Sequence, residues 1–485
     1  MTATVGPMFD VAAAAVEAAL AAGAHYADAR VMVIRQESMQ ARNRVVEDLA
    51  QSEVAGLGVR ALIGSSWGFQ ATPTLAPAAA RAAGEGAAAV ARASARVPGP
   101  PLTLSPAPVV VDSWSSRWDE HPLDEVGLAE RGDLLVAATG AAVDAGVPQA
   151  TASYQVWDTE KWFVSSEGSR VDQRVVECGA MVDATAIGDG ETQRRSYPGV
   201  LGQYGTQGWE LVRGLDLVTH AAEMAEQAQA LLSAPVCPAG VTTIVLDSDQ
   251  VALQIHESVG HAVELDRILG WEAAFAGTSW LEPGRLGRLR FGSDIMQVTA
   301  DATLPGAMGS FGYDDEGVAA QAVDIVRDGL WVGVLSGRDS APLVGRASGG
   351  MVRADGPARL PMVRMTNVGL APGESSLDEM IAGTEDGIYM ATNRSWSIDD
   401  QRLNFQFGCE VGYEVKDGRL GRLLKNPTYT GIGPRFWASL DAVGGRDELT
   451  VWGVANCGKG QPLQVGHTGH QAVPCRFRDV RVGVR

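Results

Sequence analysis

Two histidines and a glutamate stand together in the middle of the chain, in the stretch His256-Glu257-Ser258-Val259-Gly260-His261. A lone thiol, Cys457, follows much later in a glycine-rich stretch. Neutral imidazoles and a thiolate are ligands for a metal ion such as zinc, and a carboxylate beside that ion can accept a proton from water. The residue types therefore predict a catalytic metal site in which Glu257 handles the proton.

The spacing of the two histidines makes a demand on local structure. In zinc peptidases two histidines four residues apart lie within about 40° of each other around a helix, whereas histidines five residues apart differ by about 140° in a regular helix. Gly260, directly before His261, would permit a π-bulge or kink that returns both rings to one face. We therefore expect a distorted helix at this point.

The residues alone leave the third ligand open, and catalytic zinc sites usually have three protein ligands. Cys457 is one candidate, because the small residues around it let the backbone approach an ion and Lys459 would help to keep the thiol ionised. The competing candidates are the pair His467 and His470 and the carboxylates Glu264, Asp266 and Glu272. For the two later histidines, solvated positions in a glycine-rich loop are the simpler interpretation.

Hydrophobic periodicity predicts the elements that position these residues. The motif falls in a helix expected at residues 249–268, capped by Ser248. Further helices are expected at residues 8–22, 76–95 and 209–232, and β-rich segments at residues 30–34, 54–63 and 68–72. Beyond about residue 286, short β-rich segments dominate, and a helix is expected only around residues 377–382.

The chain is long enough for two hydrophobic cores, since it has 485 residues. Prolines punctuate it at Pro235 and Pro238, so we place the main domain boundary near residue 236. Residues 1–235 are expected to form a mixed α+β domain with a proline-rich connector near residues 97–108. Residues 236–485 are expected to form a β-rich, antiparallel, barrel-like domain that carries the metal site. The predicted fold class is therefore α+β.

Composition excludes several classes of function. The net charge of −19 argues against a nucleic-acid backbone or an anionic membrane as the main partner. The N-terminus has no signal-peptide pattern, and the alanine-rich run at residues 11–24 is too short and too weakly apolar to cross a membrane. Five cysteines are an odd, sparse set unlike a disulfide framework, so reduced thiols and a cytoplasmic location are expected.

The extended motif at residues 256–267, HESVGHAVELDR, resembles the HExxxH helix of the TldD/PmbA metallopeptidases. Four later segments resemble segments of that family in the same order: residues 309–318, 364–367, 386–389 and 457–460. Residues 56–60 and 68–69 are also similar to it. The resemblance covers nearly the whole chain and is strongest after residue 236.

This resemblance implies a TldD-type, metal-bearing subunit. It implies His256 and His261 as metal ligands, Cys457 as the thiolate ligand and Glu257 as the catalytic carboxylate. It also implies a heterodimer with a PmbA/TldE-like subunit that lacks the histidine motif, with a homodimer as the alternative. The chain departs from the family at Gln461-Pro462, where members often carry a further glycine.

Together these features predict a zinc-dependent peptidase, with one zinc ion per catalytic subunit and Glu257 as general base. The resemblance suggests that an unfolded peptide or peptide-derived precursor enters an enclosed chamber in extended form, held by backbone pairing. Two alternatives stay open: an amidase that tailors one natural product, and a non-catalytic, metal-stabilised subunit that binds peptide. Iron or another divalent ion is the alternative to zinc, because nitrogen and sulfur ligands favour zinc only as a tendency.

Overall fold

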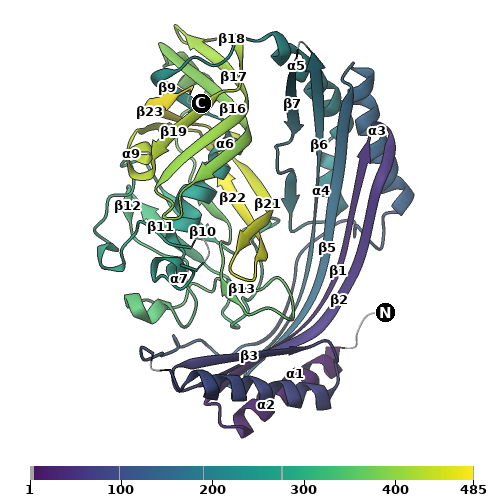
Figure 1. Ribbon diagram of the computed structural model, residues 1–485, viewed down its shortest axis with the longest axis vertical. Helices are drawn as coiled ribbons and strands as arrows, with labels where there is room; N and C mark the ends of the chain where they lie inside the picture. Colours follow the sequence, from purple (N-terminus) through teal and green to yellow (C-terminus); the bar gives the residue numbers. More distant parts are fainter. Residues whose placement is uncertain (1–4, 98, 189, 275–276, 484–485) are drawn as a thin grey trace.

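The computed structural model describes residues 5–97, 99–188, 190–274 and 277–483, so Pro98 of the predicted connector and both chain ends lie outside the described residues. Long curved strands from the first half of the chain run along one side of the molecule, and the second half is gathered on the other side (Figure 1). Helices and strands are mixed in the first half and strands dominate the second, which confirms the predicted α+β class.

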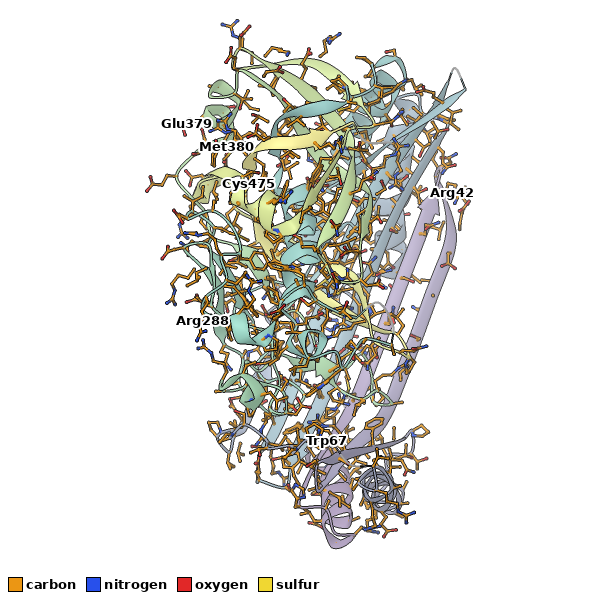
Figure 2. All side chains as sticks on the ribbon, turned by 60° about the vertical axis from the view of Figure 1, so that its left-hand side comes forward. Arg42, Trp67, Arg288, Glu379, Met380 and Cys475 are labelled. Atoms are coloured by element: carbon orange, nitrogen blue, oxygen red, sulfur yellow. The ribbon has the colours of Figure 1, made fainter. Side chains whose placement is uncertain are left out.

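An eight-stranded sheet dominates the first half, ordered β3-β2-β1-β5-β6-β4, with β7 and β8 also paired to β6. Its four longest strands are antiparallel neighbours: β1 (Tyr26–Arg42), β2 (Val45–Ile63), β5 (Gln149–Ser165) and β6 (Arg170–Gly188). The shorter strands are β3 (Ser66–Thr72), β4 (Val111–Ser115), β7 (Glu191–Tyr197) and β8 (Gln203–Gly205). The long strands span much of the molecule, since Arg42 at the end of β1 lies far from Trp67 in β3 (Figure 2).

Two pairs of helices pack on this sheet. They are α1 (Val5–Ala21) with α2 (Pro77–Ser94), and α3 (Leu128–Asp144) with α5 (Leu217–Ser233), each pair sharing a buried cluster with the strands. The helices predicted at residues 8–22 and 76–95 are confirmed. The single helix predicted at residues 209–232 is wrong, because α4 (Trp209–Gly214) ends before Asp216. Asp216 has a φ of 46°, and this left-handed backbone interrupts the helical hydrogen bonds before α5 begins.

The second half contains a closed five-stranded barrel. Its strands are β9 (Gly240–Leu246), β16 (Asp386–Ile398), β17 (Asn404–Lys416), β19 (Thr428–Ile432) and β23 (Cys475–Val482). The order β16-β9-β23-β19-β17 closes through pairing of β16 with β17. The barrel-like expectation is therefore confirmed, although β16 and β9 run parallel to each other. Strands β18 (Arg419–Lys425) and β20 (Leu440–Val443) extend the sheet.

Smaller sheets accompany the barrel in the second half of the chain. Strands β10 (Val298–Asp301), β11 (Ala322–Arg327), β12 (Leu330–Trp331) and β15 (Val368–Leu370) form one sheet, β13 (Val352–Arg353) pairs with β14 (Met362–Val363), and β21 (Thr450–Lys459) pairs with β22 (Gln464–Ala472). Helix α8 (Leu377–Ala382) was predicted, whereas α9 (Gly433–Ala438) was not.

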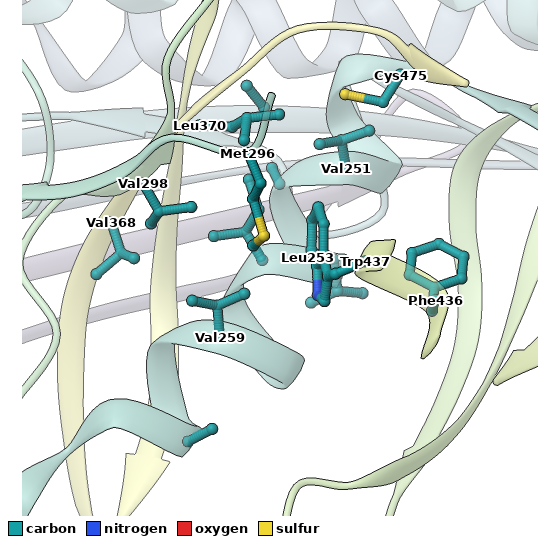
Figure 3. Packing of buried hydrophobic residues seen from close by; sticks show 14 of the residues in the cluster. Val251, Leu253, Val259, Met296, Val298, Val368, Leu370, Phe436, Trp437 and Cys475 are labelled. Carbon is teal, nitrogen blue, oxygen red and sulfur yellow. The ribbon is translucent and has the colours of Figure 1, made fainter. Parts of the chain in front are cut away.

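Helix α6 (Ser248–Ile255) is the element that carries the histidine motif into the core. Val251 and Leu253 of α6 and Val259 beyond it share one buried cluster with Met296 and Trp437 (Figure 3). Burying each of these side chains contributes roughly 1.5–3 kcal/mol. Close packing on this scale leaves the backbone at the start of the motif little freedom.

Buried ion pairs join the two halves of the chain. The carboxylate of Asp315 binds both Arg30 and Lys161, and Arg60 Nη1 lies 3.3 Å from Glu316 Oε1. Removing one partner of a buried pair is strongly destabilising, because the other charge is left uncompensated. These contacts therefore fix the long sheet against the half that carries the histidine motif.

No helix in the described part of the chain is long and apolar enough to cross a membrane. All five cysteines are buried and unpaired, as expected for reduced thiols. We retain the domain division near residue 236 as a proposal.

Candidate metal centre

The helix is distorted at the two histidines. After α6 ends at Ile255, His256–Gly260 form a π-helical turn, and a short 3-10 turn follows at His261–Val263. The ring centroids of His256 and His261 lie 4.9 Å apart, so the wider turn brings both rings to one side. The predicted distortion is confirmed.

The helix predicted at residues 249–268 begins and ends within one residue of the observed helical segments, but it is not continuous. Glu264 is extended, with a ψ of 117°, and separates the motif from the short helix α7 (Leu265–Ile268). The residue that caps the start is Asp247, whose side chain accepts a hydrogen bond from the Ser248 backbone N–H at 2.6 Å, so Ser248 is not the cap.

Gly260 has a steric role next to the second histidine. A Cβ atom at this position would lie 2.1 Å from Met365 Sδ, which real contacts do not permit. Only a residue without a side chain lets the π-turn lie this close to Met365. The glycine that suggested a bulge in the sequence therefore also provides the space for it.

His256, His261 and Cys457 come together although the cysteine is distant in sequence. One ligand atom of each lies within 4.8 Å of the others, and Cys457 Sγ is 3.5 Å from His261 Nε2. All three residues are buried. Cys457 lies on strand β21, where the pairing with β22 shifts register between Val454 and Cys457, so the glycine-rich stretch is a bulged strand.

Hydrogen bonds to the outer ring nitrogens orient both histidines. His470 Nδ1 lies 2.8 Å from the Val368 carbonyl, so it carries the proton, and His470 Nε2 is left to accept from His256 Nδ1 at 2.8 Å. The carboxylate of Glu264 accepts from His261 Nδ1 at 2.9 Å. These partners assign the proton of each motif histidine to Nδ1 and leave both Nε2 lone pairs for a metal.

The other two candidate histidines do not lie in a solvated loop, contrary to the interpretation from sequence. Both are on strand β22, and His470 is fully buried behind His256. His467 Nδ1 lies 2.8 Å from Glu177 Oε2, and its ring packs against Trp157. Neither belongs to the three-residue ligand group.

The carboxylates of Glu264 and Asp266, which follow the motif, bind Lys459 and do not belong to the ligand group. Lys459 Nζ donates to both oxygens of Asp266 at 2.8 Å and lies 3.4 Å from Glu264 Oε1. Lys459 therefore pairs with these acids. The sequence had instead suggested that it would pair with the thiol. Burial opposes ionisation of Glu264, but Lys459 and His261 hold the pKa of this carboxyl well below its usual value. Glu272 is not in the ligand group.

Burial and charge set the ionisation of the three grouped residues. Desolvation lowers the pKa of both His256 and His261, which keeps the rings neutral and able to bind a metal. Burial alone would raise the pKa of the Cys457 thiol, but His261 and Arg364 outweigh it, and this pKa lies below its usual value. Two neutral imidazoles and an easily ionised thiol are a donor set that fits a divalent metal of the zinc type.

Glu257 has a partner that sequence reasoning missed. Arg402 Nη1 donates to Glu257 Oε2 at 2.7 Å, from the turn between β16 and β17. Nothing in the motif indicates a residue so distant in sequence. Glu257 is largely buried, and this bond fixes the direction of its carboxylate.

A cavity of about 510 Å³ lies between the long strands and the second half of the chain. Trp157 of β5 lines it from the long sheet, and Arg364, Asn456 and Gly466 line it from the second half of the chain. Cys457 follows Asn456 and pairs across the hairpin with Gly466. The cavity thus reaches the strands that carry the thiol.

Comparisons with known proteins agree over most of the chain. Models of the PmbA/TldA metallopeptidase match it in three parts: domain 1 at residues 27–95, the central domain at residues 121–232 and the C-terminal domain at residues 239–482. A metalloprotease of Methanothermobacter thermautotrophicus is 30% identical over 94% of this chain and 95% of its own length. A metalloprotease TldD homolog of Haemophilus influenzae is 27% identical over 91% of this chain and 90% of its own length.

Two further relatives bear on the metal and the fold. A zinc metalloprotease TldD homolog of Saccharolobus solfataricus is 26% identical over 48% of this chain and 49% of its own length. The crystal structure of TldE from Thermococcus kodakarensis matches with a TM-score of 0.72 over 97% of this chain and 99% of that chain. At 14% identity this second likeness concerns the fold alone.

The relatives are named metalloproteases, and the matching domain models are those of metallopeptidases, so this protein is a metallopeptidase with a metal cofactor. Three matched domains and a relative 30% identical over nearly the full length show that the chain belongs to the TldD/PmbA metallopeptidase family.

Proposed function

We propose that this chain is the metal-bearing subunit of a zinc-dependent peptidase acting on unfolded peptides or peptide-derived precursors. In this proposal His256, His261 and Cys457 hold the zinc ion and Glu257 is the general base. The observation that carries the proposal is the convergence of two neutral Nε2 atoms and a thiol beside a fixed carboxylate.

The chain's own residues supply the proton handling. His256, His261 and Cys457 would hold a divalent cation, which would supply Lewis acidity for the scissile carbonyl and for water. Among the described residues, Arg402 is the hydrogen-bond partner of the Glu257 carboxylate, through Oε2, which leaves Oε1 to take the proton of the attacking water. Glu257 then delivers that proton to the leaving amine.

Binding of an extended peptide is supported by the strand next to the thiol. In the described part of the chain, β21 and β22 form a two-stranded sheet, so β21 is an edge strand. Ala455 and Asn456 of β21 line the cavity. Pairing of a peptide backbone with this edge, inside an enclosed chamber, would hold many sequences, because backbone bonds do not depend on side chains.

A PmbA/TldE-like subunit is the partner we propose, with a second copy of this chain as the alternative. The fold likeness to TldE supports two related subunits of one shape. Size-exclusion chromatography of the chain alone and mixed with such a subunit distinguishes the two assemblies.

The test is Glu257→Gln. This variant keeps the shape of the side chain but cannot accept a proton, so cleavage of an unfolded protein such as denatured casein should fall by about 10²- to 10⁴-fold. Bound zinc, measured by elemental analysis, should stay at the wild-type level, because Glu257 is not a proposed ligand.

The matched control is Glu282→Gln, the same change at an exposed glutamate outside the site. It should leave cleavage unchanged. Cleavage by Glu257→Gln at the wild-type rate would remove the general base. Absence of cleavage by zinc-loaded wild-type protein, alone and with a TldE-like partner, would reject the peptidase proposal.

A further inference from the structure

Two arginines of the β13–β14 hairpin face the cavity beside the thiol. Arg353 ends β13, and Arg364 directly follows β14. Both side chains line the cavity of about 510 Å³. The catalytic proposal uses neither of them as a reacting group.

Backbone carbonyls of the thiol-bearing hairpin hold both guanidinium groups. Arg364 Nη1 donates to the Gln464 carbonyl at 3.1 Å, and its Nη2 donates to the carbonyl of Cys457. Arg353 Nη2 donates to the His467 carbonyl at 2.7 Å. The two charges are therefore fixed next to the metal ligand, and they do not sample solvent as surface arginines do.

Gly466 makes room for one of these groups. A Cβ atom there would lie 2.4 Å from Arg364 Nη2 and 2.7 Å from its Nε. The guanidinium plane thus lies against the backbone of β22. The absence of a side chain at this one position is what allows Arg364 to reach the wall of the cavity.

Arg364 differs from the other buried arginines in its lack of a counter-ion. Of the seven arginines that are buried in the described part of the chain, six have a carboxylate within ion-pair distance. These six are Arg30, Arg60, Arg131, Arg195, Arg267 and Arg338. Arg364, only 2% exposed, has none among the described residues, and its Nε is buried without an acceptor.

Arg353 repeats this pattern nearby. It has no carboxylate partner among the described residues, and its Nε is also buried without an acceptor. Burial, together with the charge of Arg364, lowers the pKa of Arg353 to about 10. Burial and the repulsion between the two cations thus outweigh the attraction of Arg353 to Glu177, Asp315 and Cys457, and an anion bound between the arginines would offset that cost.

The acids around the cavity are already engaged. Glu177 binds His467, and Asp315 binds Arg30 and Lys161. Asp355 accepts from the Val465 backbone N–H at 2.8 Å. Among the described residues, none of these three carboxylates forms an ion pair with Arg353 or Arg364.

We propose that Arg353 and Arg364 form a subsite, next to the metal ligands, that binds a carboxylate of the peptide substrate. Guanidinium groups match carboxylates in shape and charge, and such bonds are stronger than neutral ones. The carboxylate comes either from the C-terminus of the peptide or from an acidic side chain near the scissile bond. This inference rests on the proposed peptidase function and deepens it, since it names the feature that the site selects.

Binding of three fluorescent peptides tests the subsite without any cleavage. The protein is the zinc-loaded full chain with Glu257→Gln. The probes are dansyl-Ala-Ala-Ala-Ala with a free C-terminal carboxylate, the same peptide as a C-terminal amide, and dansyl-Ala-Ala-Glu-Ala amide. Fluorescence anisotropy should show at least one carboxylate probe binding about 10- to 100-fold more tightly than the neutral amide. The carboxylate probe that binds more tightly than the neutral amide identifies the source of the carboxylate.

Matched variants assign the preference to the arginines. Arg353→Gln, added to the same protein, should abolish most of the preference, whereas Arg288→Gln at an exposed site should retain it (Figure 2). Circular dichroism checks that Arg364→Gln folds before it is measured, and Arg353→Gln decides the outcome if it does not. Chelator-treated protein should keep the preference, because the arginines and not the metal bind the carboxylate.

Equal binding of all three probes would overturn the subsite, as would binding of none. So would a preference that survives Arg353→Gln, or one that disappears when the metal is removed. None of these results depends on cleavage. If the Glu257→Gln protein prefers carboxylate probes but the zinc-loaded wild-type chain, alone and with a TldE-like partner, cleaves no peptide, the peptidase proposal is rejected and the subsite stands.

Discussion

In the described part of the chain, two groups of side chains have the composition of a metal site. Each group brings one ligand atom per residue within 4.8 Å of the others. The Cys457 group is His256, His261 and Cys457, and the His121 group is His121, Asp124 and Asp158. Proximity does not separate the two groups, but their hydrogen-bond partners do.

In the His121 group the donor atoms are already used. Asp158 accepts from Arg35 Nε at 3.1 Å and Arg174 Nη2 at 2.8 Å, and His121 Nε2 lies 3.3 Å from it. His121 Nδ1 accepts from the backbone N–H of Asp124 at 3.2 Å, so its Nε2 carries the proton. Burial opposes ionisation of Asp158, but these partners hold the pKa of this carboxyl well below its usual value. A metal ion would have to displace two arginines.

In the Cys457 group the hydrogen-bond partners leave the metal-binding atoms free. His470 and Glu264 engage the outer nitrogens, and the Nε2 lone pairs and the thiol remain on the inside. The nearby cation Lys459 binds carboxylates and not the ligand atoms. The difference teaches that a metal site is indicated by lone pairs that remain after hydrogen bonding, and not by the mere presence of ligand residues.

Cys457→Ala should produce the largest effect that separates the groups. We expect zinc to fall from stoichiometric to background after dialysis, because the removed thiolate is one of three proposed ligands. Elemental analysis measures the result. His121→Gln in the other group and His467→Ala on β22 are the controls, and both should retain zinc. Loss of zinc from His121→Gln would break the comparison.

Asp158→Asn should instead act on stability. Asp158 is buried, and the change removes the buried one of the two carboxylates that pair with Arg35 and Arg174, so that only the half-exposed Asp124 remains. We expect the free energy of unfolding to fall by about 3 kcal/mol, the lower end for a broken buried pair, because both arginines keep partial contact with solvent. Urea denaturation measures the loss, and zinc content should not change. Loss of zinc with unchanged stability would reverse the roles of the two groups.

The same variant carries a pH signature. The pKa of Asp158 is lowered in the folded state, so its stabilisation is complete above the unfolded pKa of about 3.9 and is lost as pH falls below it. The stability difference between wild type and Asp158→Asn should therefore shrink by about 1 kcal/mol between pH 6 and pH 3. A difference that grows on acidification would contradict this account.

The sequence indicated the proposed ligands and the proposed base more readily than the residues that orient them. His256, Glu257 and His261 are adjacent enough for their spacing to carry meaning, and Gly260 indicated the distortion. Cys457 needed the resemblance to a family, because a distant thiol has no spacing to interpret. Arg402 could not be predicted, since its role depends on a turn that tertiary packing brings to Glu257.

The strands show the same limit in the fold. Residues 30–34 and 54–63 were predicted as β-rich, but β1 and β2 extend far beyond them. Residues 45–54 of β2 are exposed along their whole length. Because neither face of this segment is buried, its sequence does not need the alternation of apolar and polar residues that identifies a strand. Pairing with β1 keeps this segment extended, and pairing is not a local property of sequence.

His470→Phe should give the smallest of these effects and the finest test of the comparison. It removes the acceptor for His256 Nδ1–H but leaves all three proposed ligands in place. Loss of such an orienting partner lowers metal affinity by about 10- to 100-fold, which is less than loss of a ligand. Competition with a chelator measures the affinity, and His467→Phe on the same strand should not change it.

A second variant separates orientation from simple packing. His470→Gln restores an acceptor oxygen and should recover part of the affinity that His470→Phe loses, although both variants change the shape of the buried ring. Zinc loss as complete as in Cys457→Ala would make His470 a ligand itself. An unchanged affinity in His470→Phe would show that the outer hydrogen bonds do not distinguish the Cys457 group, because the lone pair of His256 would then reach the metal without a partner to direct it.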